Sequence, residues 1–279
     1  MQKLIEVDQE LAQRYGAYAS YKTDLDPVIE TFGDDSAAEV DRLLDRFAQS
    51  ESHVLDLGCG AGFTTCRLAL NVAEVWGFDM DSKLLAAARL RAQAIGLENV
   101  HFISGNVTHP EDVKQLPENT FDLVLSRRGP NVNAVLSKLK PDALVIQELF
   151  QGYLGLLEMF GRKSFLADIG DNPRWLVDEY AWINLFPVSV KEYYFESYFK
   201  DTDHLAAYLA QSTALYEWPL PPMPYQEPRD CPALELYARY NQTPRGIRVV
   251  HVRGVYLFRR TAVLYAPADP AIRPASRDE

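Results

Sequence analysis

The sequence has few cysteines, no long apolar run and no long basic run. Its 279 residues include only three cysteines, and Cys59, Cys66 and Cys231 are spaced for neither a disulfide framework nor a metal site. No stretch approaches the roughly 20 apolar residues of a membrane-spanning helix, and the first residues lack the apolar core of a signal peptide. These absences favour a cytoplasmic protein with no metal and no membrane partner.

Positive charge is also scarce. The chain has 28 lysines and arginines against 39 aspartates and glutamates, which gives a formal net charge of −11. A broad nucleic-acid-binding surface needs clustered lysines and arginines, so nucleic acid is not an expected partner. The hydrophobic fraction of 47% is enough for one large α/β domain, or for one domain with a sizeable insertion.

The most informative stretch is residues 54–62, a short apolar run followed by alternating glycines. The run is typical of a buried parallel strand, and residues 63–70 then have a helical pattern. Glycines between a strand and a helix let the backbone turn sharply and let a ligand approach closely. The dinucleotide-binding spacing G-x-G-x-x-G is not met in either register, because Phe63 or Thr65 stands where the last glycine belongs. The spacing that fits is D-x-G-x-G-x-G, from Asp56 through Gly58 and Gly60 to Gly62.

This motif resembles the first cofactor-binding motif of the class I S-adenosylmethionine (SAM)-dependent methyltransferases. The strands at residues 120–126 and 139–148 resemble the family too, although Asp142 and Ala143 replace two glycines in the turn before the second of these strands. The resemblance implies an α/β fold with a Rossmann-like, seven-stranded, mostly parallel sheet, helices on both faces, and an antiparallel last strand beside the fifth. It also implies SAM as the cofactor, lying across the carboxyl ends of the first, second and fourth strands.

The same resemblance assigns further cofactor contacts. Asp79 ends the second strand about 20 residues after the glycine turn, where an acid binds ribose hydroxyls. Met80 stands where an apolar residue faces the adenine. Asn106 replaces an acid that accepts a hydrogen bond from the adenine amino group, and the backbone N–H of Val107 is placed to serve the ring. The full set of expected cofactor-binding residues is Asp56, Gly58, Gly60, Gly62, Asp79, Met80, Asn106, Val107 and Ser126.

No motif identifies a catalytic residue. Arg127 and Arg128 follow the fourth strand, at the position where open α/β sheets bind ligands. Guanidinium groups pair well with carboxylates and phosphates, so these arginines either contact an anionic group of the acceptor or form an ordinary surface pair. His109 is a further weak candidate, because a lone histidine in a loop is more often a surface residue than a base.

The chain divides into four expected parts. Residues 1–50 form a helical N-terminal cap, in which Tyr15, Tyr18 and Tyr21 share one helix face and either pack on the domain or cover the substrate. Residues 51–150 form the SAM-binding core, and residues 151–265 form the second half of the same domain, with insertions on the substrate side. Residues 149–160 read as a helix, prolines at 219–228 as an irregular loop, and residues 266–279 as a flexible tail.

The sequence therefore predicts a SAM-dependent methyltransferase that acts on a small molecule, anionic if the two arginines contact it. The alternatives are a methyltransferase of protein or RNA, and a non-catalytic protein that binds SAM or S-adenosylhomocysteine (SAH). Aminopropyl transfer on the same fold is disfavoured, because Arg127 and Arg128 stand where a polyamine substrate requires acids. The acceptor atom, the general base and the oligomeric state stay open.

Overall fold

The structure is a computed structural model that describes residues 29–32, 36–127, 129–160, 174–211 and 225–261. Several expectations fall outside these residues: the tyrosines at positions 15, 18 and 21, Arg128, the prolines at 219–224, and the tail 266–279.

Five parallel strands form one half of the central sheet. They are β2 (His53–Leu57), β3 (Glu74–Asp79), β4 (Val100–Ser104), β5 (Phe121–Arg127) and β6 (Leu139–Leu154), and they lie in the order β6-β5-β2-β3-β4. Helix α3 (Phe63–Ala69) joins β2 to β3, and α4 (Ser82–Ile95) joins β3 to β4. The sheet order reverses between β2 and β5, so their carboxyl ends flank the position where such sheets bind ligands.

Antiparallel strands form the other half of the sheet. The last long strand, β9 (Gly246–Arg260), lies between β6 and β7 (Leu185–Phe199) and is antiparallel to both. This arrangement confirms the predicted Rossmann-like fold and the antiparallel last strand beside the fifth. Two strands go beyond the expected seven: β1 (Ile29–Phe32) pairs with β7, and the two-residue β8 (Gln242–Thr243) pairs with β9. The segment before residue 50 is therefore not only helical.

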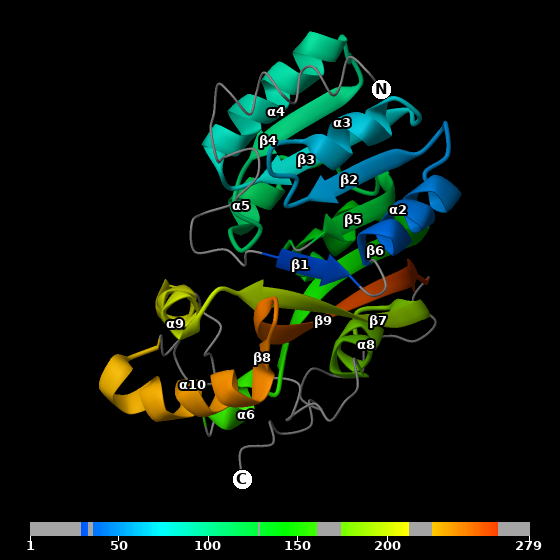
Figure 1. The fold of residues 1–279 in the computed structure, drawn as a ribbon. Coiled ribbons are helices and arrows are strands. Elements are labelled where there is room, and N and C mark those ends of the chain that lie inside the picture. The colour runs from blue at the N-terminus through cyan, green and yellow to red at the C-terminus, as the bar shows by residue number, and fades with distance from the viewer. Residues whose placement is uncertain (1–28, 33–35, 128, 161–173, 212–224, 262–279) are drawn as a thin grey trace.

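Helices pack on both faces of the sheet. On one face, α2 (Ser36–Phe47) and α3 enclose a core that includes Val40, Leu44 and Leu68. On the other face, α8 (Arg174–Ala181), α5 (Pro110–Val113) and the 3-10 helix η2 (Val132–Lys138) enclose a second core around Leu176 and Tyr180. The view in Figure 1 shows α4 beside β4 at the far edge of the sheet.

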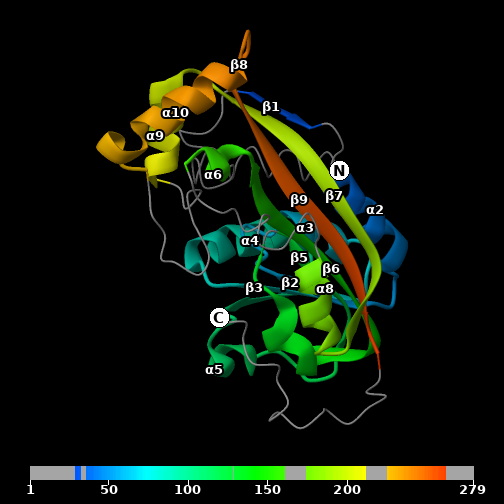
Figure 2. The same cartoon turned by 90° about the horizontal axis from the view of Figure 1, so that it is seen from below.

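Strands β6, β7 and β9 continue past the carboxyl edge of β5. Residues 149–154 of β6 have no partner on β5 but pair with β9, and β7 accompanies β9 along its whole length. Helices α6 (Leu156–Met159), α9 (Thr202–Gln211) and α10 (Glu227–Asn241) pack at the end of these strands (Figures 1 and 2). We call this part of the molecule, residues 149–159, 193–211 and 225–254, the extension.

The extension has its own hydrophobic core. Its buried side chains are Tyr153, Leu156, Phe199, Leu205, Leu209, Tyr225, Leu234, Tyr237, Ala238, Ile247 and Val249. Because the extension lies beyond the carboxyl ends of the parallel strands, it stands at the same edge of the sheet as the expected cofactor position.

Two elements differ from the sequence-based expectations. The predicted helix over residues 149–160 is wrong for most of its length, because β6 continues to Leu154 and only α6 is helical. Pairing with β9 decides this, since the apolar run 149–157 suits either element. Helix α10 was not predicted, and the irregular loop expected up to residue 228 is wrong at Pro228, which lies in the first turn of α10, where a missing N–H costs nothing.

Candidate functional site

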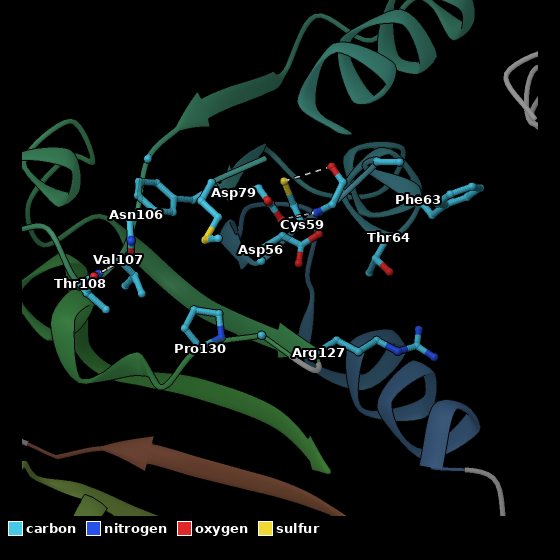
Figure 3. Close-up of a pocket in the computed structure, with 17 residues that line it drawn as sticks. Asp56, Cys59, Phe63, Thr64, Asp79, Asn106, Val107, Thr108, Arg127 and Pro130 are labelled. Carbon is cyan, nitrogen blue, oxygen red and sulfur yellow. Dashed lines mark hydrogen bonds between the residues drawn. The ribbon is translucent and has the colours of Figure 1, made fainter. Parts of the chain in front are cut away.

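A cavity opens at the carboxyl ends of β2, β3 and β5 and has a volume of about 980 Å³. The predicted residues Asp56, Gly58, Gly60, Asp79, Met80, Asn106 and Val107 line it, together with Cys59, Ala61, Phe63, Thr64, Phe78, Gly105, Thr108, Arg127, Gly129 and Pro130. The cavity is elongated: Asn106, Val107 and Thr108 lie at one end, and Thr64 and Arg127 at the other, with Asp79 between them (Figure 3).

The glycine loop depends on a backbone conformation that other residues rarely adopt. Gly58, Gly60 and Gly62 all have positive φ angles, of 81°, 54° and 73°. At Gly62 there is also no room for a side chain, because a Cβ would lie 2.8 Å from the Cβ of Ala88 on α4. Gly62 is therefore needed for the close approach of α4 to the loop, although it does not itself line the cavity.

Asp56 ends β2 beneath the loop and is 3% exposed. Its Oδ2 accepts a hydrogen bond of 2.6 Å from the hydroxyl of Thr65. Burial raises the pKa of the Asp56 carboxyl to about 6, against the opposing effects of the Thr65 hydrogen bond and the positive charge of Arg127. At neutral pH the carboxylate form dominates, and it places a negative charge beneath the glycine loop.

Asp79 lies in the middle of the cavity and is fixed by two backbone groups. Its Oδ2 accepts from the N–H of Gly60, and its Oδ1 accepts from the N–H of Asp81, both at 2.8 Å. Each carboxylate oxygen has a further lone pair. The carboxylate can therefore orient the glycine loop and also accept hydrogen bonds from a diol, as the sequence predicts for the ribose.

The end of the cavity expected to hold the adenine is formed by Asn106 and its neighbours. The Asn106 Oδ1 accepts from both the N–H and the hydroxyl of Thr108, at 2.9 and 2.8 Å. These bonds engage the oxygen expected to accept from an adenine amino group, and the predicted contact of Asn106 with the adenine stays a prediction. Val107 lies at the same end, and Met80 also lines the cavity and is 74% exposed. Their predicted contacts with the adenine stay predictions.

Arg127 lies at the opposite end, and carboxylates already surround its guanidinium group. Its Nε donates to Oε2 of Glu148 at 3.2 Å, and its Nη1 lies 3.8 Å from Asp41. Glu148 is 1% exposed and also accepts from the hydroxyl of Ser36 at 2.7 Å. Arg127 is thus a fixed side chain and not a freely moving surface arginine, while its predicted contact with an anionic acceptor stays a prediction.

Besides Gly62, two predicted site residues do not line the cavity. Ser126 is completely buried and donates to the carbonyl of Pro130 at 2.7 Å. Side chains alternate along a strand, so Ser126 and Arg127 point to opposite faces of the sheet, and the cofactor contact predicted for Ser126 gains no support from its side chain. His109 begins α5, with its Nδ1 3.6 Å from Asp112, and does not line the cavity.

The sequence analysis missed Gly129 and Pro130, which form one wall of the cavity. A Cβ on Gly129 would collide with the carbonyl oxygen of Leu57, so glycine lets this wall approach the end of β2. The Gly-Pro pair after β5 was the available signal, because such pairs mark tight turns.

Within the part of the chain that the structure describes, no three His, Cys, Asp or Glu side chains gather as a metal site would require. Among the same residues, no helix has the length and apolar character needed to cross a membrane. The cytoplasmic location stays a prediction.

The fold and the position of the cavity agree with the resemblance to class I SAM-dependent methyltransferases. Residues 48–152 match the model of a family described as a methyltransferase domain. These residues contain the motifs that resemble the cofactor-binding motifs of the class I SAM-dependent methyltransferases.

Solved structures share the fold over most of the chain. A functionally unknown protein from Deinococcus radiodurans superimposes with a TM-score of 0.61 and 18% identity, over 90% of this chain and 99% of that one. The YcgJ protein of Bacillus subtilis gives a TM-score of 0.55 and 16% identity, over 81% of this chain and 99% of that one. The fold therefore extends well beyond the residues that match the family model.

Curated relatives match shorter parts of the chain. The 23S rRNA (uracil(1939)-C(5))-methyltransferase RlmD of Xanthomonas campestris is 40% identical over 78 residues, which are 28% of this chain and 18% of RlmD. The protein-L-isoaspartate O-methyltransferase of Nitrosomonas europaea is 26% identical over 142 residues, 49% of this chain and 58% of that enzyme. This chain spans less than a fifth of RlmD and under two thirds of the second enzyme.

These relatives correct one expectation. The exclusion of nucleic acid as a partner is wrong, because one of the matched enzymes is named for its RNA substrate. Its basis was the net charge of −11, which sums over the whole molecule, whereas binding depends on the local field of one surface.

The cavity suits the cofactor of this family. Its elongated shape, the loop of positive-φ glycines and the carboxylate of Asp79 fit an adenosine joined to an amino acid. SAM supplies a methyl group on a positively charged sulfur when it is bound. The residues that would hold it are those of the cavity, from Val107 at one end to Thr64 and Arg127 at the other.

Proposed function

We propose that the protein transfers a methyl group from SAM to a small molecule. The observation that supports this substrate class is the extension, which places a second layer of packed helices and strands beyond the carboxyl edge that carries the cavity. None of its described residues lines the cofactor cavity, but it stands beyond the edge of the sheet onto which the cavity opens, where an acceptor of limited size would be enclosed as ligands usually are.

The chain's role in the reaction is to position the cofactor and the acceptor and to shield them from water. The glycine loop and Asp79 fix the cofactor, and Gly129 and Pro130 form a wall beside it. Alignment of the acceptor atom with a methyl group supplies much of the rate enhancement in transfers of this kind. A general base is needed only when the acceptor is protonated at neutral pH, and no residue of the cavity is assigned to that task.

A second candidate is methylation of RNA or of a protein. The specific observation in its favour is the pair of matched enzymes, one named for an RNA substrate and one for a protein substrate. The shared segment with the RNA enzyme covers 18% of that enzyme. This likeness therefore supports the cofactor chemistry more strongly than the acceptor class.

A labelling experiment separates the two candidates. The purified protein is incubated with SAM carrying a radioactive methyl group and with a cell extract divided into small-molecule, RNA and protein fractions. We expect label in the small-molecule fraction. Label confined to RNA or to protein contradicts the proposed acceptor class but keeps the methyltransferase activity, and SAM binding without label in any fraction favours a non-catalytic binding protein.

A further inference from the structure

Charged side chains are few in the cofactor cavity and lie at defined places. Among the described residues that line it, the acids are Asp56 and Asp79, and the positively charged side chain is Arg127. Bound SAM carries two positive groups, the sulfonium and the ammonium, and one negative group, the carboxylate. The charges of the cavity are therefore opposite to those of the cofactor: two acids for the two positive groups of SAM, and Arg127 for its carboxylate.

The position of Arg127 along the cavity agrees with this pairing of charges. Asp79 takes the central position expected for the ribose, and Val107 lies at the adenine end. The amino-acid part of the cofactor must then extend in the opposite direction. Figure 3 shows Thr64 and Arg127 at that end, with Asp56 nearby. The charge of Arg127 also lowers the pKa of Asp56, which places the two side chains within electrostatic range.

The ion pairs of Arg127 leave part of its guanidinium group available. Nε and Nη1 face Glu148 and Asp41, whereas Nη2 takes part in no hydrogen bond or ion pair among the described residues. The Arg127 side chain is 24% exposed. A guanidinium group has five N–H donors in a fixed plane, so it can hold two protein carboxylates on one edge and a ligand carboxylate on another.

The two carboxylates beside Arg127 are shared with other arginines. Asp41 also pairs with Arg67 at 2.6 Å, and Glu148 lies 3.9 Å from Nη1 of Arg253. Among these three arginines, Arg127 is the one that lines the cavity, at its amino-acid end.

We propose that Arg127 binds the carboxylate of the methionyl part of SAM, and that Glu148 and Asp41 hold its guanidinium group in place for this contact. The pairing across neighbouring strands fixes the geometry, since Arg127 on β5 and Glu148 on β6 occupy paired positions in the sheet. Arg127 then serves the cofactor instead of an anionic acceptor. The proposal rests on SAM as the cofactor and does not depend on the acceptor class.

A pair of ligands tests this contact directly. SAH keeps the carboxylate, and S-adenosyl-thiopropylamine is the same molecule without it. Calorimetry on the full chain should show that the wild-type protein binds the decarboxylated ligand roughly tenfold to a hundredfold more weakly than SAH, as expected for a lost hydrogen bond to a charged group.

Variants of Arg127 complete the test. We expect Arg127→Ala to weaken SAH binding by the same roughly tenfold to hundredfold, and to change binding of the decarboxylated ligand by less than about threefold. Arg127→Lys should lie between, because it keeps the charge and loses the planar fork. If Arg127→Ala does not fold, because Glu148 is left buried with less compensation, the wild-type comparison and Arg127→Lys still decide the question.

Arg67→Ala is the matched control. Arg67 pairs with the same Asp41 but does not line the cavity, so this variant should bind both ligands within about threefold of the wild type. Equal affinity of the wild-type protein for the two ligands would overturn the proposal, and so would an equal loss for both ligands in the Arg127 variants. Failure of the wild-type protein to bind SAH at all would instead contradict the cofactor.

Discussion

At the scale of single residues, Asp79 connects the glycine loop to the cofactor cavity. Its two oxygens accept from Gly60 and Asp81, and the sequence predicts that they also bind the ribose. Asp79→Ala should therefore weaken SAH binding roughly tenfold to a hundredfold, because hydrogen bonds to a charged acceptor are lost. Calorimetry with a folded variant measures this change.

The neighbouring Asp81 provides the control for Asp79. Its carboxylate accepts from the N–H groups of Lys83 and Leu84 and caps α4 without lining the cavity. Asp81→Ala should lower stability by about 1 kcal/mol, the usual effect of a lost N-cap, and leave SAH affinity nearly unchanged. An unaltered dissociation constant in Asp79→Ala would remove Asp79 from the cofactor site.

His251 makes a second prediction at this scale, on the dependence of stability on pH. It is 5% exposed and stacks on Phe195 at 4.4 Å between ring centroids. Burial, with a further effect from Arg253, lowers the pKa of His251 to about 3 from 6.5. Between these values the unfolded chain binds a proton that the folded chain does not, so this group contributes full stability above the unfolded pKa and loses it as pH falls.

The variant His251→Phe keeps an aromatic ring and removes the titration. As the pH falls from about 6 to 5, the wild type should lose about 1.4 kcal/mol of unfolding free energy relative to the variant. Asp56, whose pKa is raised to about 6, acts in the opposite sense but is present in both proteins. Urea unfolding at several pH values measures the difference, and parallel curves would mean that folding does not lower the pKa of His251.

The residues that could be predicted from the sequence are those that the spacing of the glycine motif places. Asp56, Asp79 and the glycines could be placed because each depends on its distance from a single strand–loop–helix unit. The hydrogen-bond partners of Ser126 and Asn106 could not be predicted, because one depends on which face of β5 a side chain takes and the other on the hydroxyl of Thr108 two residues away. Neither fact is contained in residue type and spacing alone.

At the scale of elements, the contact between the glycine loop and α4 gives a prediction with an internal control. Gly62 and Gly96 share a φ of 73°, but a Cβ would meet Ala88 at 2.8 Å at position 62 and nothing within 4 Å at position 96. Gly96→Ala should cost about 1–2 kcal/mol of stability from the left-handed backbone alone. Gly62→Ala should cost about 1–3 kcal/mol more from overpacking.

Only the change at position 62 should also weaken cofactor binding, because α4 and the glycine loop must move apart to make room for the alanine side chain. Thermal or urea unfolding with SAH titrations of both variants measures the two effects. Equal stability losses, with equal SAH affinities, would show that the loop tolerates a wider separation from α4.

Elements made by local pattern were predictable, and those decided by distant partners were not. The capped helix α4, with Asp81 at its start and Gly96 at its end, follows from residues close in sequence. The last third of β6 follows from pairing with β9, about 100 residues later. Strand β1 likewise forms against β7, at the opposite end of the sheet from β4. Neither β1 nor the last third of β6 can therefore be predicted from its own sequence.

At the scale of the whole molecule, the extension and the parallel half of the sheet have separate hydrophobic cores. Leu234→Ala in α10, at a side chain only 1% exposed, should cost about 2–5 kcal/mol as a buried cavity forms. We expect the loss to be local, because stability differs between cooperative units of one structure. Hydrogen exchange should accelerate in α9 and α10 but not in β2–β5, and SAH affinity should stay within about twofold.

The matched variant is Leu43→Ala in α2, which belongs to the core on one face of the sheet and is 3% exposed. This change should accelerate exchange in β2 and β5 instead. Uniform acceleration in both variants would show that the extension and the sheet unfold as one unit.

The position of β9 has a consequence for how the protein is made. A ribosome completes β6 and β7 before the strand that must lie between them, since β9 begins at Gly246. Until then each of these long strands carries backbone groups that have no partner on the side where β9 will pair, and exposed strand edges promote association between chains. The cofactor half can fold early during synthesis, whereas the extension is assembled only after β9 has been made.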